Sequence, residues 1–133
     1  GGEQAEDPEL GRWRPAAPLT GFVIRAAARR ADALREAWGD GVCVMLVDDL
    51  PPGPLPDVGG VPLAVVGDAD AWQRQYATLQ AVRASGDMVV GSDCATELRT
   101  LVGERELPPY ARPRAARAWL VAGGASPRRV VLP

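Results

Sequence analysis

The stretch Val42–Leu50 constrains the fold of this chain more than any other. It reads V-C-V-M-L-V-D-D-L, so six apolar residues run directly into two carboxylates, Asp48 and Asp49. An apolar run of this length, rich in β-branched residues, predicts a strand buried on both faces. In an open parallel sheet, ligands bind at the carboxyl ends of the strands. The sequence therefore places both acids where a functional site is expected.

Helical and strand-like patterns alternate on either side of this stretch. Thr20–Trp38 carries apolar residues at helical spacing and is predicted to be a helix that ends at Gly39. Asp68 or Asp70 is expected to cap a second long helix. The later elements are a strand, that helix, a strand, a short helix and two terminal strands: Val61–Val66, Ala71–Ala84, Met88–Val90, a helix that follows Ser92 or Asp93, Arg117–Val121 and Arg129–Leu132.

This order of elements predicts an α/β fold. Alternating helices and strands imply right-handed crossovers and a mostly parallel sheet flanked by helices. The pair of glycines at 123 and 124 predicts an antiparallel hairpin at the C-terminal end. In the second long helix, Trp72, Tyr76 and Leu79 are expected to face the sheet.

Two stretches are predicted to lack regular structure. Residues 1–18 form an irregular acidic arm with Trp13 as its anchor, and residues 19–133 form a single α/β domain. Leu50–Gly60 holds four prolines and three glycines in eleven residues, which excludes helix and strand. Because this proline loop leaves directly from the acid pair, it is either a lid or a connection.

The residue types that are missing exclude several kinds of chemistry. All fifteen basic residues are arginine, and histidine is absent as well as lysine. The chain therefore lacks a Ser-His-Asp or Cys-His site, a histidine-ligated metal, a Schiff-base lysine and a complete G-x-x-x-x-G-K-[ST] phosphate loop. Cys43 and Cys94 lie in apolar surroundings, which favours two reduced thiols in a cytoplasmic protein over a disulfide.

The acid pair has a functional interpretation and a structural one. An apolar strand that ends in two acids is the physical content of a Walker B motif, in which Asp48 would help to hold Mg²⁺ and Asp49 would polarise the attacking water. In the structural interpretation, Asp48 accepts backbone N–H groups and Asp49 caps the proline loop. Adjacent carboxylates repel, so a nearby arginine could also neutralise them.

The order of the elements resembles the C-terminal half of an FtsK/SpoIIIE-type ATPase domain, as in DNA translocases and type VII secretion ATPases. The resemblance covers residues from about Thr20 to the end. It rests on V-C-V-M-L-V-D-D-L, on the family's sensor strand matched by V-P-L-A-V-V, and on the later proline–arginine element R-E-L-P-P leading into R-A-A-R-A-W-L-V. It implies the second half of a RecA-like domain, with ATP and Mg²⁺ as the family's cofactors.

The chain also departs from that family. It has no Walker A motif, the first strands of such a domain would precede residue 1, and the sensor strand runs into Asp68, an acid that would oppose phosphate. The resemblance therefore implies a catalytically degenerate module, without a cofactor of its own, that acts in assembly or in binding a partner or substrate. Such a module is expected in the cytoplasm, with any membrane tether left to other parts of a longer protein.

Three alternatives remain open. The arginine-rich C-terminal segment, with Arg112, Arg114 and Arg117, could contact DNA phosphates or an acidic partner. A phosphoacceptor receiver also gathers acids at strand ends, but it needs a lysine that this chain lacks. If strands before residue 1 are missing, an open sheet edge could support a homodimer.

Overall fold

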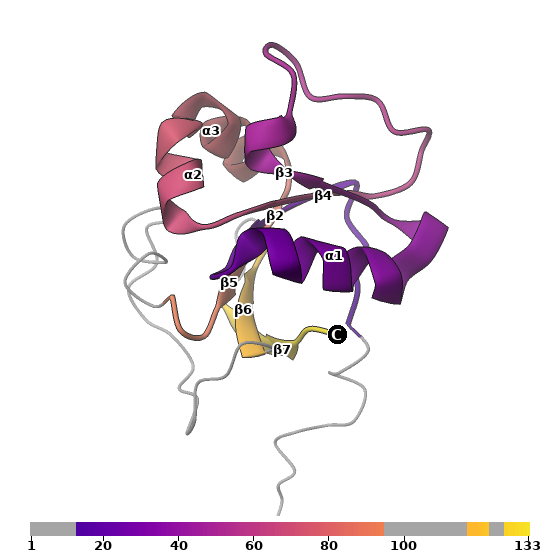
Figure 1. Cartoon of the computed structure of the whole chain (residues 1–133), viewed down its shortest axis with the longest axis vertical. Coiled ribbons are helices and arrows are strands. Elements are labelled where there is room, and N and C mark those ends of the chain that lie inside the picture. Colours follow the sequence, from indigo (N-terminus) through magenta and orange to yellow (C-terminus); the bar gives the residue numbers. More distant parts are fainter. Residues whose placement is uncertain (1–12, 95–116, 123–126) are drawn as a thin grey trace, which may run out of the picture.

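The computed structural model describes residues 13–94, 117–122 and 127–133. In this part of the chain, a six-stranded mixed sheet runs in the order β3-β4-β2-β5-β6-β7 (Figure 1). The four strands on one side of it are parallel, and the last two form an antiparallel hairpin. The predicted α/β class and mostly parallel sheet are therefore confirmed. The strands are β2 (Leu19–Val23), β3 (Cys43–Leu46), β4 (Leu63–Gly67), β5 (Asp87–Gly91), β6 (Arg117–Val121) and β7 (Arg128–Val131).

The prediction of one helix over Thr20–Trp38 is wrong in its first part. The chain forms β2 at Leu19–Val23 and begins helix α1 (Ala27–Trp38) only after a short turn. The apolar run L-T-G-F-V-I fits both a buried helix segment and a buried strand, and periodicity alone does not separate the two. Tertiary pairing decides, because β2 lies between two parallel neighbours, β4 and β5.

This strand changes the expected composition of the sheet. The chain itself supplies the central strand of the described sheet, β2, between β4 and β5. Gly21 permits the close packing of that centre, because a Cβ there would lie 2.8 Å from the Met88 sulfur and 3.2 Å from the Trp72 ring. The described fold therefore begins with a strand–turn–helix unit, β2–turn–α1.

Helices cover both faces of the sheet (Figure 1). On one face, α1 packs through Ala31, Leu34 and Trp38 against a cluster that includes Phe22. Trp13 joins that cluster and packs edge-on against Phe22 and Trp38, at 6.1 and 6.4 Å between ring centroids. On the other face lie α2 (Ala69–Arg74) and α3 (Tyr76–Ser85), over a cluster centred on Trp72, Leu79 and Val82.

The second long helix is broken into two. Gln75 has non-helical backbone angles, which separate α2 from α3. The break turns Tyr76 outward, so its side chain is 57% exposed and the prediction that it faces the sheet is wrong. Trp72 and Leu79 are fully buried, as predicted. Asp68 is the N-cap of α2, which resolves the choice between Asp68 and Asp70.

The proline loop is a connection rather than a lid over the acids. No helix or strand lies between the turn at Val47–Asp49 and β4, and the loop carries the chain from one end of the sheet to the other (Figure 1). Near its end, residues 55–58 and 60–61 line a hollow of about 260 Å³ with Pro18, Leu19 and Leu63, at the start of β2 and β4. Both parallel strands begin at this hollow, and the acid pair lies at the other end of the sheet. The end of the proline loop therefore does not cover the acids.

Other predictions have mixed outcomes. Strands β5, β6 and β7 match their predicted positions to within about a residue. Cys43 and Cys94 are both free thiols, the second buried and the first half-buried. The short helix expected after Ser92 or Asp93 has only its first residues in the described part, where Cys94 follows a turn and its N–H donates to the Gly91 carbonyl at 2.8 Å. The rest of that helix and the glycine pair of the hairpin turn lie outside the described residues. In the described ranges, no helix has the length and apolar character needed to cross a membrane.

Candidate functional site

The carboxyl ends of β2, β3 and β4 meet at a topological switch point. After β2 the chain crosses on the α1 face, and after the neighbouring β4 it crosses on the α2–α3 face. A crevice opens between adjacent parallel strands whose connections leave in opposite directions, and this is where open α/β sheets bind ligands. Here the crevice is an open pocket of about 430 Å³, lined by residues 26–29, 46–48 and 66–68 with Ala71 and Arg74.

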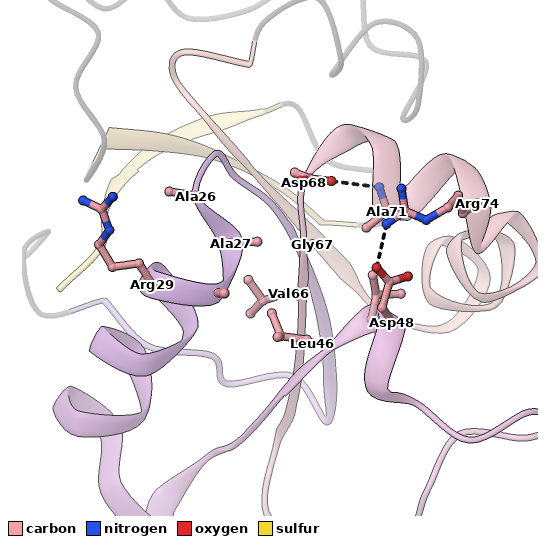
Figure 2. Close-up of a pocket in the computed structure, with 12 residues that line it drawn as sticks. Ala26, Ala27, Arg29, Leu46, Asp48, Val66, Gly67, Asp68, Ala71 and Arg74 are labelled. Carbon is pink, nitrogen blue, oxygen red and sulfur yellow. Dashed lines mark hydrogen bonds and ion pairs between the residues drawn. The ribbon is translucent and has the colours of Figure 1, made fainter.

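The floor of the pocket is apolar and its rim is charged. Leu46 and Val66 come from the ends of β3 and β4, Val47 from the turn after β3, and three alanines, residues 26–28, from the start of α1. The charged side chains around the rim belong to Arg29, Asp48, Asp68 and Arg74 (Figure 2). Rim charges above an apolar floor are typical of small-ligand sites.

Asp48 lines the pocket and is held there by two side chains from the end of α2. The chain turns after β3 into a short 3-10 turn, Val47–Asp49, which brings Asp48 to the rim. Arg74 Nη2 donates to Asp48 Oδ2 at 2.6 Å, and Gln75 Nε2 donates to Asp48 Oδ1 at 3.5 Å. Figure 2 shows Arg74 reaching across from α2 to this carboxylate. The partners of Asp48 are thus side chains, and not the backbone N–H groups of the structural interpretation.

The electrostatics of the rim keep Arg74 charged. Its hydrogen bond to Asp48 raises the pKa of Arg74, the charge of Asp48 adds to that, and more distant Asp68 and Asp70 contribute further. The pair is largely solvent-accessible, with 60% of the Arg74 side chain and 44% of the Asp48 side chain exposed. Arg74 therefore neutralises Asp48, as the interpretation with a nearby arginine expected.

The acid after β4 has a structural task. Asp68 Oδ1 accepts a hydrogen bond from the Ala71 N–H at 2.8 Å, which caps α2 (Figure 2). Trp72, on the same helix, is buried, and its indole N–H donates to the Phe22 carbonyl of β2 at 2.8 Å. The cap and this buried bond fix the start of α2, and the helix then carries Arg74 toward Asp48.

The turn after β2 is too short to be a phosphate loop. Only residues 24–26 separate β2 from α1, whereas a P-loop needs the eight positions of G-x-x-x-x-G-K-[ST]. Ala26 ends the turn with φ 50°, and α1 has neither a side-chain cap nor an acid in its first turn. Arg29 follows on α1, on the opposite side of the pocket from Asp48, and its guanidinium points away from that acid (Figure 2).

The predicted site residues are only partly brought together. Asp48 lines the pocket, whereas Asp49 is exposed on the same turn and does not line it. Arg117 begins β6, four strand spacings from β3, which corresponds to roughly 19 Å of sheet. It is half-buried and already has an interaction partner. Arg112 and Arg114 lie outside the described residues.

Sequence reasoning missed the other half of the rim. Arg74 and Gln75 lie 26 and 27 residues from Asp48 and carry no motif that links them to it. The sequence does single out Asp68, as a possible helix cap and as the acid after the second buried strand, but it does not link Asp68 to Asp48. Among the described residues, no three histidine, cysteine, aspartate or glutamate side chains gather into a metal-binding group.

Comparison of the chain with protein-family models, with curated proteins and with solved structures finds no match.

Proposed function

We propose that this chain is a catalytically degenerate module of an FtsK/SpoIIIE-like, nucleotide-driven translocase, and that it acts in assembly or in binding a partner. The proposal is supported by the arrangement of three strand ends around one pocket. A strand–turn–helix unit, β2 with α1, lies in the middle of the sheet, and a strand that ends in two acids lies two positions away. P-loop ATPases place the phosphate loop in such a strand–loop–helix unit.

The observation that carries the proposal is the Asp48–Arg74 ion pair. A Walker B carboxylate serves catalysis by holding Mg²⁺ against nucleotide phosphates, which requires an acid that faces the metal. Here Arg74 Nη2 lies 2.6 Å from Asp48 Oδ2, and Gln75 contacts the other oxygen. The chain itself thus supplies the counter-charge for that carboxylate.

The remaining rim supports the same conclusion. Triphosphate binding needs backbone N–H groups and a lysine around the phosphates, and the three-residue turn after β2 offers no such loop. Asp68 and Asp70 add negative charge beside the pocket. The pocket at the strand ends thus lacks the groups that hold phosphate, which supports a structural or partner-binding role over hydrolysis.

Calorimetric titration of ATP with Mg²⁺ into this chain tests the proposal directly. We expect no heat beyond dilution, and the same result for ATP without metal. An Arg74→Ala variant serves as the matched control. It removes the counter-charge of Asp48 but leaves the turn after β2 unchanged, so it separates the effects of these two features on binding. Micromolar binding of ATP–Mg²⁺ by the unaltered chain would overturn the degenerate assignment.

A second experiment uses the complete gene product. If that protein hydrolyses ATP, we expect Asp49→Asn to leave its turnover nearly unchanged, because Asp49 does not line the pocket. Loss of a working general base costs roughly 10²-fold or more. A loss of that size would show that the acid pair completes an active site with parts supplied from elsewhere.

A further inference from the structure

The strand that carries the acid pair also forms an edge of the sheet. In the described part of the chain, β3 pairs with β4 on one side and is the last strand of the order β3-β4-β2-β5-β6-β7. An edge strand offers unpaired N–H and C=O groups to any other extended chain. The way in which these groups are satisfied therefore decides whether the edge is open.

The register shows which peptide groups face outward. Cys43 lies opposite Leu63, and its N–H donates to the Pro62 carbonyl at 2.9 Å, so the peptide groups of Cys43 point toward β4. Groups alternate along a strand, so those of Met45 point the same way and those of Val44 and Leu46 point outward. Two residues thus supply all the outward hydrogen-bonding groups of β3.

A side chain from α1 already occupies one of these outward groups. Arg35 Nε donates to the Val44 carbonyl at 3.1 Å, in a partly buried position. The other end of the guanidinium is fixed by Asp32, one helical turn earlier, at 2.8 Å from Nη1 to Oδ1. Arg35 therefore reaches from the helix to the strand edge and places a charged group on its hydrogen-bonding side.

The sequence of this edge makes such protection necessary. Val42–Val47 is a run of six apolar residues with no charge and no proline, which is the signature of a segment that pairs with its own copies. Cys43, Met45 and Leu46 are only half-buried, so the strand also offers apolar side chains. Both ends of β3 run into 3-10 turns, at Gly39–Gly41 and Val47–Asp49, which keep the edge short.

We infer that Arg35 guards the edge of β3 against strand addition by a second copy of this chain. The Arg35 guanidinium donates a hydrogen bond to the Val44 carbonyl. This bond would have to break before β3 of another copy could pair there. Short edge strands and edge charges are the usual protections against such pairing. The native chain therefore does not form an edge-to-edge homodimer, whereas a chain without the Arg35 side chain can form one.

Light scattering coupled to size-exclusion chromatography tests this inference over a wide concentration range. We expect the mass of one chain for the native protein and, at high concentration, at least twice that mass for Arg35→Ala. Glu36→Ala is the matched control, because this exposed residue is the next one on α1 and makes no hydrogen bond or ion pair with β3 in the described structure. It should stay monomeric. An Arg35→Ala variant that stays monomeric at every concentration, or a native chain that dimerises, would overturn the inference.

A second substitution separates edge pairing from simple unfolding. Met45→Lys places a charge on β3 itself, where its half-buried side chain can extend to solvent. We expect Arg35→Ala combined with Met45→Lys to return to the mass of one chain. If Arg35→Ala folds poorly, Arg35→Met keeps the aliphatic stem without the donor and takes its place. Association that persists in the double variant would show that another surface is responsible, and the inference would fail.

Discussion

The buried centre of the sheet and the rim of the pocket are held together in different ways, although they meet on one short helix. Trp72 and Arg74 are two residues apart on α2, yet Trp72 is fully buried and 60% of the Arg74 side chain is exposed. Trp72 packs against β2 and donates to its Phe22 carbonyl. Arg74 meets Asp48 in solvent, where an ion pair contributes little to stability.

The difference shows what fixes the crevice. Its walls come from strands and helices that are positioned by packing, so its shape does not depend on the charges at its rim. Changes in the charges at the rim should therefore leave the fold and the shape of the crevice unchanged.

Removing Trp72 should have the largest effect and sharpen the comparison most. Trp72→Ala opens a large cavity between α2 and β2, and we expect the free energy of unfolding to fall by about 3–5 kcal/mol. Urea denaturation followed by circular dichroism measures it. Tyr76→Ala, four residues along and 57% exposed, is the control and should change stability by less than about 0.5 kcal/mol. Equal losses at the two sites would break the contrast between centre and rim.

A methyl group at Gly67 tests the packing directly below the pocket. A Cβ there would lie 2.7 Å from Val47 Cγ1 and 3.1 Å from the Trp72 indole nitrogen. We therefore expect Gly67→Ala to cost about 1–3 kcal/mol. Gly91→Ala, at the end of β5, is the matched control, because its closest neighbour, an Asp93 carboxylate oxygen, lies 3.0 Å away on a side chain that can move. A Gly91 loss as large as the Gly67 loss would contradict the tight fit at the pocket floor.

The cap of α2 lies between the two regions and should have an intermediate effect. Asp68→Ala removes the acceptor for the Ala71 N–H, and we expect a loss of about 1 kcal/mol. Asp68→Asn keeps a capping oxygen and should recover most of that stability, which thermal unfolding of both variants can measure. If Asn behaved like Ala, the charge of Asp68 rather than its hydrogen bond would be what matters at the rim.

The sequence predicts much of the centre and little of the rim, for physical reasons. Continuous apolar runs identified β3, β4 and β5, because burial on both faces leaves a strong pattern. The same kind of run at Leu19–Ile24 was assigned to a helix, since short apolar runs fit both structures. The position of Asp48 followed from the strand that precedes it.

The partners of Asp48 could not be predicted in the same way. Arg74 reaches it because Gln75 breaks the helix and the Asp68 cap sets where α2 begins. No spacing rule connects residues 26 positions apart on different elements. Tyr76 shows the same limit, because helical periodicity placed it inside until the break at Gln75 turned it outward.

The ion pair at the rim should have the smallest effect on stability. We expect Arg74→Ala to move the thermal midpoint by less than about 3 °C. The reason is that two exposed charged side chains gain nearly as much free energy from contact with water as from contact with each other. Asp48→Asn should have a similarly small effect, and any effect of either variant should shrink as salt is added. Since the pKa of Arg74 is raised in the folded state, its stabilising charge is fully present below the ordinary pKa of arginine and is lost only as the pH rises through the still higher folded-state pKa. Arg74 therefore adds no pH dependence to the neutral range.

A double variant decides whether the rim is independent of the centre. If Asp48 and Arg74 contribute only through one screened pair, Asp48→Asn with Arg74→Ala should have nearly the same midpoint as either single variant. A midpoint far below both would mean that each side chain supports the packing around Trp72 as well. The rim would then be part of the core, and Asp48 would have a role in the stability of the fold.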